Sequence, residues 1–395
     1  MDRVIVVGGG LAGVRSAEAL RAAGYEGALT LLSAEPHRPY DRPPLSKAVL
    51  MGDTDDTTVE ADWDALRCDL LLGTRATALH VAAGGGGTVA TTGGDLSFDG
   101  LVIATGATPV TLPGEGPQRV LRTIEDARGL RERLREGTRV VIVGAGWIGA
   151  EVATAAAKKG CAVTVVEAAD TPLAHAVGTE IGAHTARWYA EAGVELRTGL
   201  KVAAVEGGGL ALADGGRIDA DEVVVGVGVR PEVAWLDGSG LEIDGGVVTD
   251  ASLRTSAPGV VAVGDCAAWW SERYGRRMVV EHWDTALNAP EVAAASLLGR
   301  DAAYDAVPYF WSEQFGRMVQ YAGHHPAAER MIYRGDPAGP GWAACWLAGD
   351  RLAAVLAVDR PRDLVQGRRI IAAGTPVDAD SVADPDIPLR NAVLT

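Results

Sequence analysis

Two glycine-rich turns are the residues of this chain whose types and spacing most clearly suggest chemistry. Each turn follows an apolar run typical of a buried strand: the residues are Gly8, Gly10 and Gly13 after Arg3–Val7, and Gly144, Gly146 and Gly149 after Arg139–Val143. A tight turn that opens a helix brings backbone amides and the positive end of the helix dipole to a phosphate group. One such motif is weak evidence, but two of them, about 136 residues apart, predict two dinucleotide-binding units.

A carboxylate after the second strand of such a unit accepts a hydrogen bond from the adenosine ribose. Glu167 directly follows the strand-like run Ala162–Val166 and takes this place in the second unit. No basic residue follows nearby to meet a 2′-phosphate, so Glu167 favours NADH over NADPH. In the first unit the nearest carboxylate after the run Ala28–Leu32 is Glu35, one residue beyond the ideal position because Ala34 intervenes.

The other elements follow from hydrophobic periodicity. Helices are predicted over Val14–Ala23 and Ala150–Lys159, after the two glycine turns. From about Tyr304 the pattern changes to alternating segments, with a strand predicted over Leu352–Val358 and a helix over Leu364–Ile371. We therefore expect an α/β protein with two Rossmann-like dinucleotide-binding domains and a smaller C-terminal α+β domain.

Composition and charge argue against several classes of protein. The 395 residues, 48% of them hydrophobic, provide material for two or three domains. The formal net charge of -16 argues against nucleic-acid binding, which needs clustered Lys and Arg. Because no apolar stretch reaches about 18 residues and no cleavable signal precedes the first strand, we expect a cytoplasmic protein without a membrane partner. The four cysteines lie far apart in sequence, which predicts neither a redox-active disulfide nor a metal site.

Five further motifs, in order along the chain, make the pattern specific. They are the run from His37 to Lys47 (HRPYDRPPLSK), Ala104-Thr105-Gly106, Val263-Gly264-Asp265, Glu281-His282-Trp283, and Phe310-Trp311-Ser312-Glu313-Gln314. Together with the two glycine turns, over nearly the whole length, this order resembles the FAD-dependent ferredoxin reductases of oxygenase and cytochrome P450 systems. The long run ending in Lys47 is the most discriminating motif.

The resemblance implies FAD and NADH as cofactors and assigns residues to each. FAD would be bound by Gly8, Gly10, Ala12, Gly13, Glu35, Arg42, Lys47, Ala76, Arg122, Asp265 and Trp283. NADH would be bound by Gly144, Gly146, Ile148, Gly149, Glu151 and Glu167. The implied domains are an FAD domain of residues 1–110 and 231–305, an NAD domain of residues 111–230, and a C-terminal domain of residues 306–395.

Lys47 and Glu151 are the predicted catalytic residues. Hydride transfer requires the nicotinamide C4 to lie about 3–3.5 Å from the flavin N5, and a nearby cation stabilises the negative charge of a reduced flavin. We expect Lys47 to supply that cation, and Glu151 to pair with Lys47 and to reorient when the nicotinamide binds. The alternatives are a solvated surface lysine and an ordinary first-turn glutamate favoured by the helix dipole.

The absence of cysteine near these residues narrows the choice of electron acceptor. Disulfide reductases keep a cysteine pair beside the flavin, and the segment from Arg42 to Lys47 has no cysteine. The resemblance then favours one-electron delivery to a small iron–sulfur ferredoxin that serves a P450 or another oxygenase. A rubredoxin reductase, and a flavoprotein with a binding role like the apoptosis-inducing relatives, stay open as alternatives. The intact glycines disfavour a cofactor-free fold.

Docking of a ferredoxin poses an electrostatic problem for this chain. Ferredoxins are generally acidic, so an acidic reductase must concentrate positive charge near its flavin. The candidate residues for that patch are Arg276, Arg277, Arg317, Arg360 and Arg362. The sequence leaves open whether the C-terminal domain also forms a homodimer interface.

Overall fold

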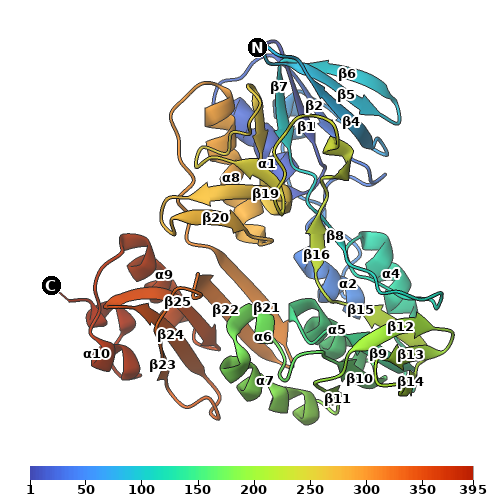
Figure 1. The fold of residues 1–395 in the computed structure, drawn as a ribbon, viewed down its shortest axis with the longest axis vertical. Coiled ribbons are helices and arrows are strands. Elements are labelled where there is room, and N and C mark those ends of the chain that lie inside the picture. Colours follow the sequence, from blue (N-terminus) through green and yellow to red (C-terminus); the bar gives the residue numbers. More distant parts are fainter. Residues whose placement is uncertain (395) are drawn as a thin grey trace. The chain divides into compact units, whose positions relative to one another are not determined.

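The computed structural model describes residues 1–394 (Figure 1), and by its internal contacts the chain divides into two compact units. Unit 1 comprises residues 1–41, 56–108 and 230–308. Of the described residues, unit 2 comprises 42–55, 109–229 and 309–394. The chain therefore passes between the units several times, and the short strands β8 (Ala107–Pro109) and β16 (Val229–Pro231) lie at two of these crossings.

Unit 1 is built on a five-stranded parallel sheet with the strand order β18-β7-β1-β2-β3. The strands are β18 (Val260–Ala262), β7 (Gly100–Ile103), β1 (Arg3–Val7), β2 (Ala28–Leu32) and β3 (Cys68–Leu71). The central strands are apolar at nearly every position because both faces of the sheet are covered. On one face α1 (Leu11–Ala22) packs against α8 (Trp283–Leu297).

The opposite face of the unit 1 sheet is covered by β-structure. An antiparallel sheet of β4 (Ala76–Val81), β5 (Gly87–Thr91) and β6 (Gly94–Phe98) contributes Leu79, Val89 and Phe98 to a core with Ile5 and Ile103. The remaining elements of this unit are α3 (Trp63–Leu66), η2 (Ala234–Leu236), β17 (Val247–Thr249), η3 (Gly264–Cys266), β19 (Ala267–Ser271) and β20 (Arg276–Val279).

Unit 2 contains a second parallel sheet with the order β11-β10-β9-β15. Its strands are β11 (Glu195–Arg197), β10 (Ala162–Val166), β9 (Arg139–Val143) and β15 (Glu222–Val225). The associated elements are η1 (Pro43–Ser46), α2 (Ala48–Met51), α4 (Ile124–Arg133), α5 (Trp147–Lys158), α6 (Ala174–Val177), α7 (Thr179–Glu191), β12 (Val202–Glu206), β13 (Gly209–Leu212) and β14 (Arg217–Asp219). One core joins α2, α4 and α5 to this sheet, so the short segment 42–55 is packed into unit 2.

The last part of unit 2 is an antiparallel sheet with the order β21-β22-β25-β24-β23 (Figure 1). The strands are β21 (Tyr309–Gln314), β22 (Arg317–Gly323), β23 (Arg330–Arg334), β24 (Trp342–Ala348) and β25 (Arg351–Val358), followed by α9 (Pro361–Ala373), α10 (Ala379–Ala383) and η4 (Leu389–Ala392). Trp188 of α7 packs on one face of the sheet with Leu356. On the other face α9 approaches Val355 closely: a Cβ on Gly367 would lie 2.7 Å from the Val355 Cγ1.

The structure confirms the predicted fold class. β1, β2, β9 and β10 have the predicted bounds, whereas α1 and α5 begin three residues earlier than predicted, at Leu11 and Trp147. The glycines at the third position of each motif therefore lie inside the helices. Among residues 1–394 no helix is long and apolar enough to cross a membrane.

Candidate functional site

The first glycine turn is shaped by close backbone contacts that exclude side chains. Gly8 has a φ of +123°, and a Cβ there would lie 2.1 Å from the Ala104 carbonyl oxygen. A Cβ on Gly13 would lie 1.8 Å from the Gly8 carbonyl oxygen, so α1 can cross the turn only without a side chain at this position. A Cβ on Gly10 would meet no atom within 4 Å. The fold therefore requires glycine at Gly8 and Gly13 and leaves open space beside Gly10.

The second glycine turn repeats this geometry. Gly144 has a φ of +100°, and a Cβ on Gly149 would lie 1.9 Å from the Gly144 carbonyl oxygen. Gly146 begins α5 with φ -78° and ψ -169°, close to the φ of -83° and ψ of -173° of Gly10 before α1. A Cβ on Gly146 would again meet no atom within 4 Å. The two turns are thus near-copies, each with open space at its middle glycine.

Among residues 1–394, no side chain caps the amino end of α1 or of α5. Neither helix has a side-chain cap or an acidic residue in its first turn. By contrast, α4 begins with a full capping box of Thr123 and Asp126. Two 12-residue helices, each with an N-cap glycine that has open space beside it, fit a bound pyrophosphate. The residues present therefore fit a dinucleotide at each turn.

Glu167 is held against the second turn by backbone hydrogen bonds. Its Oε2 accepts from the amide of Ala145, the residue between the first two glycines, and its Oε1 accepts from the amide of Ala169, both at 2.8 Å. The equivalent position in the first unit is Ser33, because the Gly8 and Gly144 amides donate to the last residues of β2 and β10. Glu35 thus lies two residues beyond the position equivalent to Glu167, rather than one.

The other predicted FAD residues of unit 1 lie in several segments. Asp265 is in η3, where the preceding Gly264 would place a Cβ 3.1 Å from the Cβ of Ala12 in α1. Trp283 is the first residue of α8, and its Nε1 donates to Asp41 Oδ1 at 2.9 Å. The structure therefore brings Asp265 close to the first turn and ties Trp283 to the end of the His37–Asp41 segment.

Glu35 and Ala76 are placed separately. The hydroxyl of Tyr40 donates to the Glu35 carboxylate. Ala76 is the first residue of β4 and packs on the core beneath the parallel sheet of unit 1. Neither observation places these two residues at the first glycine turn.

Arg42, Lys47 and Arg122 belong to unit 2. The Arg42 guanidinium donates to the carbonyl oxygen of Arg122, so the structure brings these two arginines together. The Arg122 amide in turn donates to Asp126 at 3.0 Å, which fixes it at the beginning of α4. Gly8 and the other FAD residues named above belong to unit 1.

Lys47 and Glu151 form an ion pair in unit 2. The Lys47 Nζ lies 2.8 Å from the Glu151 Oε2, and the Glu151 side chain is only 4% exposed. Ser46 also donates to Oε2, whereas Ser312 donates to Oε1 at 2.6 Å and the Glu313 amide at 3.2 Å. A buried carboxylate requires such partners, because desolvation without them would be costly. Ser46 and Ser312 were not among the site residues predicted from the sequence. The signal that could have identified them is their position in the motifs His37–Lys47 and Phe310–Gln314.

Two exposed apolar residues lie beside the second turn. Ile148, the second residue of α5, is 43% exposed. Val227 is 40% exposed, and its Cγ1 would lie 3.4 Å from a Cβ on Gly144. Val227 was not predicted from the sequence. Its segment, Gly226-Val227-Gly228, directly follows β15, and Thr105-Gly106 follows β7 in a similar way after one intervening residue. Exposed apolar side chains beside a polar turn are suited to contact an aromatic ligand.

His282 and Cys266 are buried titratable groups close to Asp265. Burial lowers the pKa of His282 to about 4, against the opposing influence of the Asp265 carboxylate. Burial also raises the pKa of Cys266, whose Sγ lies 3.3 Å from the carbonyl oxygen of Val263 and 3.5 Å from that of Ile103. All four cysteines are free thiols. His282 therefore stays neutral at ordinary pH, and Cys266 stays a thiol.

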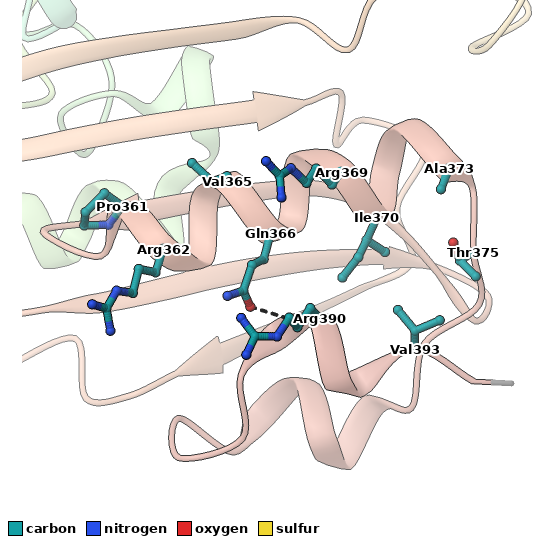
Figure 2. Close-up of a pocket in the computed structure, with 10 residues that line it drawn as sticks. All are labelled: Pro361, Arg362, Val365, Gln366, Arg369, Ile370, Ala373, Thr375, Arg390 and Val393. Atoms are coloured by element: carbon teal, nitrogen blue, oxygen red, sulfur yellow. Dashed lines mark hydrogen bonds between the residues drawn. The ribbon is translucent and has the colours of Figure 1, made fainter.

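The C-terminal sheet carries a basic groove between α9 and η4. It has a volume of about 480 Å³, and Figure 2 shows Arg362 and Arg369 of α9 on one side and Arg390 of η4 on the other. Val365, which is 48% exposed, also lines it. In the described part of the chain, neither Arg362 nor Arg369 forms a side-chain ion pair, unlike Arg360, which pairs with Asp363. The groove thus combines three arginines with an apolar surface.

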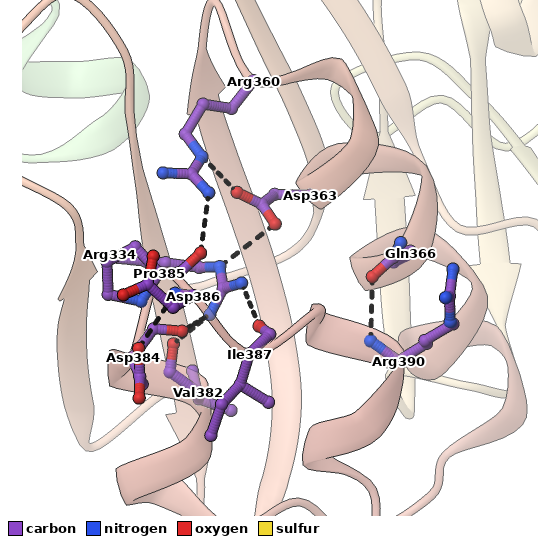
Figure 3. Close-up of polar contacts among 10 residues, drawn as sticks. All are labelled: Arg334, Arg360, Asp363, Gln366, Val382, Asp384, Pro385, Asp386, Ile387 and Arg390. Carbon is purple, nitrogen blue, oxygen red and sulfur yellow. Dashed lines mark hydrogen bonds and ion pairs between the residues drawn. The ribbon is translucent and has the colours of Figure 1, made fainter.

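A buried arginine fixes the segment that carries Arg390. Arg334 is 1% exposed; its Nε donates to Asp363 at 3.0 Å, and its guanidinium also donates to the carbonyl oxygens of Val382, Asp384 and Ile387 (Figure 3). Asp363 lies in the first turn of α9. The two sides of the groove are therefore joined through one guanidinium group.

Taken together, two parallel sheets with twin phosphate-binding turns, and a buried lysine–glutamate pair next to one of them, define a dinucleotide-dependent oxidoreductase. Residues 2–289 match the pyridine nucleotide-disulphide oxidoreductase family, and residues 309–393 match the reductase C-terminal family. The chain belongs to the pyridine nucleotide-disulphide oxidoreductase family.

Its relatives are similar over their whole length. The chain is 38% identical to the ferredoxin–NAD(+) reductase component of the anthranilate 1,2-dioxygenase system of Burkholderia cepacia, covering 98% of each chain. Among solved structures, it is 50% identical to Fdr9, with a TM-score of 0.94 and coverage of 98% of this chain and 99% of that one. It is also 34% identical to the reductase in a covalent putidaredoxin reductase–putidaredoxin complex, with a TM-score of 0.94 and coverage of 99% and 98%.

Proposed function

We propose that this protein is an FAD-containing, NADH-dependent ferredoxin reductase of an oxygenase system. The observation that carries the proposal is the pair of near-identical glycine turns, of which only the second is closed by a carboxylate, Glu167. Similarity to a dioxygenase-system reductase and to putidaredoxin reductase over whole chains supports the same function. The carrier is a small iron–sulfur ferredoxin, and the terminal enzyme is a P450 or another oxygenase.

Each cofactor has its own proposed residues. The first turn, with Gly8, Gly10, Ala12, Gly13 and Asp265, holds FAD, together with Glu35, Ala76, Trp283, Arg42, Lys47 and Arg122. The second turn, with Gly144, Gly146, Ile148, Gly149 and Glu167, holds NADH. When bound, FAD would accept two electrons from NADH together and release them singly.

The chain's own residues position and stabilise this chemistry. Each helix amino end binds the pyrophosphate of its dinucleotide and so fixes the reactive ring at the other end. Lys47 would place a cation where negative charge develops on the reduced flavin. Glu151 holds Lys47 in position and lies in the first half of α5, the helix that begins at the NADH turn.

The proposed domains follow the three large sheets. Residues 1–110 and 231–305 form the FAD domain, residues 111–230 the NAD domain and residues 306–395 the C-terminal domain. The two parallel sheets and the antiparallel sheet support this division, except that residues 42–55 pack against the sheet of the proposed NAD domain. We further propose that the protein acts in the cytoplasm.

The basic groove is the proposed docking surface for the ferredoxin. The chain has a formal net charge of -16, so an acidic carrier needs a local positive surface. Of the five candidate arginines from the sequence, Arg362 lines the groove. Arg317 pairs with Glu191, Arg360 pairs with Asp363, Arg277 donates to two backbone carbonyls, and Arg276 is an exposed residue at the start of β20. Arg369 and Arg390 were not among the candidates and complete the groove.

NADH-driven reduction of a panel of ferredoxins and rubredoxins, with NADPH as the control nucleotide, tests the function. Fast reduction of at least one ferredoxin by NADH is expected. Preferential reduction of rubredoxin would favour a rubredoxin reductase. A bound flavin that NADH does not reduce would favour a binding role, as in the apoptosis-inducing relatives.

Charge reversal in the groove tests the docking surface. Arg362→Glu and Arg390→Glu should raise the KM for ferredoxin about tenfold or more at low salt, with no change in NADH-driven ferricyanide reduction. Arg135→Glu, at an exposed position elsewhere in unit 2, is the matched control. Equal effects of all three substitutions would exclude the groove as the docking surface.

A further inference from the structure

The Phe310–Gln314 segment forms an edge strand whose contacts follow one face of α5. The ring centroids of Phe310 and Trp147 lie 4.3 Å apart. The Ser312 Oγ lies 2.6 Å from Glu151 Oε1, and the Phe315 amide donates to the Thr154 Oγ1 at 2.9 Å. The helix residues are spaced i, i+4 and i+7, which places them on one face. Phe310 and Ser312 share one face of β21 because side chains alternate along a strand. The strand therefore packs along the helix that begins at the second glycine turn.

The carboxylate of Glu151 is divided between two sets of donors. One oxygen, Oε2, accepts from the Lys47 ammonium at 2.8 Å and from the Ser46 hydroxyl. The other oxygen, Oε1, accepts from the Ser312 hydroxyl and from the Glu313 amide. With donors on both oxygens, the carboxylate plane cannot rotate without breaking hydrogen bonds. Its direction toward Lys47 thus depends on residues 161 and 162 positions away in sequence.

The Ser312 hydroxyl has its single proton directed by a third residue. The Gln314 Nε2 donates to the Ser312 Oγ at 3.1 Å, and both side chains are almost completely buried. Ser312 has one proton to donate, and the carboxylate is the stronger acceptor, so the amide must act as the donor to Oγ. Among the described residues, the Gln314 Oε1 has no hydrogen-bond partner. A buried acceptor without a hydrogen bond destabilises the fold. In this conformation, however, the Gln314 amide group directs the Ser312 proton toward Glu151.

We propose that Ser312 is a positioning residue that, with the Glu313 amide, holds Glu151 in the orientation that keeps Lys47 in place for electron transfer from NADH. The inference rests on the proposed function only for the step that Lys47 serves. The hydrogen bonds from which we argue are formed within this chain and do not depend on the proposed function. The Phe310–Gln314 segment thereby makes the C-terminal sheet part of the site that is otherwise formed by α5 and the segment before α2.

Ser312→Ala is the principal test, with Thr154→Val as a matched control. Thr154→Val removes a hydrogen bond between α5 and the residue that follows β21, one turn from Glu151, without touching the carboxylate. Ser312→Ala should slow flavin reduction by saturating NADH about tenfold or more and leave the Kd for NADH unchanged, because a hydrogen bond to a charged group is lost. Ser312→Thr, which keeps a hydroxyl, should recover most of the rate. Thr154→Val should retain the wild-type rate.

A second readout uses the protein without its cofactors. Lys47, 19% exposed and paired, should be acylated slowly by acetic anhydride in the apoprotein, as measured by peptide mass spectrometry. Ser312→Ala should raise that rate several-fold relative to exposed lysines, and Thr154→Val should not. Equal Lys47 acylation in Ser312→Ala and wild type, or the same increase in Thr154→Val, would overturn the positioning role. Failure of wild-type flavin to accept electrons from NADH would overturn the proposed function but leave the acylation result decisive for Ser312.

Discussion

Lys47 and Glu151 are 104 residues apart in sequence, and their Nζ and Oε2 atoms lie 2.8 Å apart in unit 2. The pair joins two segments that local sequence patterns cannot connect. Because the Glu151 carboxylate is buried, it cannot lose its cation without consequence for both stability and charge placement.

Replacement of Lys47 by methionine should affect chemistry more than cofactor binding. We expect NADH-driven flavin reduction, measured by stopped-flow absorbance, to slow by about 10²-fold, as for loss of one preorganised donor to a developing charge. The free energy of unfolding should fall by about 1–3 kcal/mol because Glu151 loses a partner. The double variant Lys47→Met/Glu151→Gln should recover stability but not the rate. An unchanged rate in Lys47→Met would remove Lys47 from the mechanism.

The glycines of each turn should separate into two classes. Gly10→Ala and Gly146→Ala place a methyl group in open space, so the apoprotein should keep its melting temperature. Gly10→Ala should lose FAD, and Gly146→Ala should keep FAD but weaken NADH binding about tenfold or more, since the methyl group would occupy pyrophosphate space. Gly13→Ala and Gly149→Ala should instead destabilise the fold, because each new Cβ would lie under 2 Å from a carbonyl oxygen. Thermal melts and isothermal titration distinguish the two classes.

Glu167 should set the preference between nucleotides. Glu167→Gln should raise the KM for NADH several-fold, because the ribose loses a charged acceptor. It should also reduce the preference for NADH over NADPH, measured as the ratio of their kcat/KM values, because a 2′-phosphate loses a repulsive neighbour. Glu195→Gln, on the neighbouring strand β11, is the control. Steady-state kinetics with both nucleotides give the result. If the ratio stays the same in both variants, the preference comes from another residue.

His282 should make stability depend on pH in a defined window. Its folded pKa of about 4 lies below the ordinary value of 6.5, so the unfolded chain takes up the proton first as pH falls. The free energy of unfolding should therefore decrease as pH drops from about 6.5 toward 4, by about 2 kcal/mol between pH 7 and pH 5 from this residue. His282→Asn should flatten that slope in denaturant titrations. Parallel slopes in the two proteins would contradict the assignment.

The cysteines should play no part in turnover. Burial raises the pKa of Cys68 to about 11 and that of Cys345 to about 12, and it also raises the pKa values of Cys161 and Cys266. Thiolate is therefore scarce at neutral pH. N-ethylmaleimide should leave ferredoxin reduction unchanged, while denaturation should expose four reactive thiols. Rapid inactivation at neutral pH would indicate a thiol step that the fold does not suggest.

Local sequence was sufficient for the strands and turns but not for the contacts between distant segments. β1 and β9 were predictable because both faces are buried, which makes their sequences continuously apolar. The helix beginnings were predicted too late because glycine disfavours helix, yet Gly13 and Gly149 are helical where the helix must touch the preceding turn. The contact of Ser312 with Glu151 depends on tertiary packing across 161 residues, and no periodic pattern encodes it.

In the docking surface proposed above, the guanidinium of Arg334 affects how quickly one carrier can replace another. Because it already joins α9 to the segment before Arg390, the two sides of the basic groove need little ordering when a partner arrives. Little conformational entropy is then lost on docking, and shallow electrostatic contacts suffice for a brief encounter. A surface of this kind suits rapid arrival and departure, as required of a reductase that must load one carrier molecule after another.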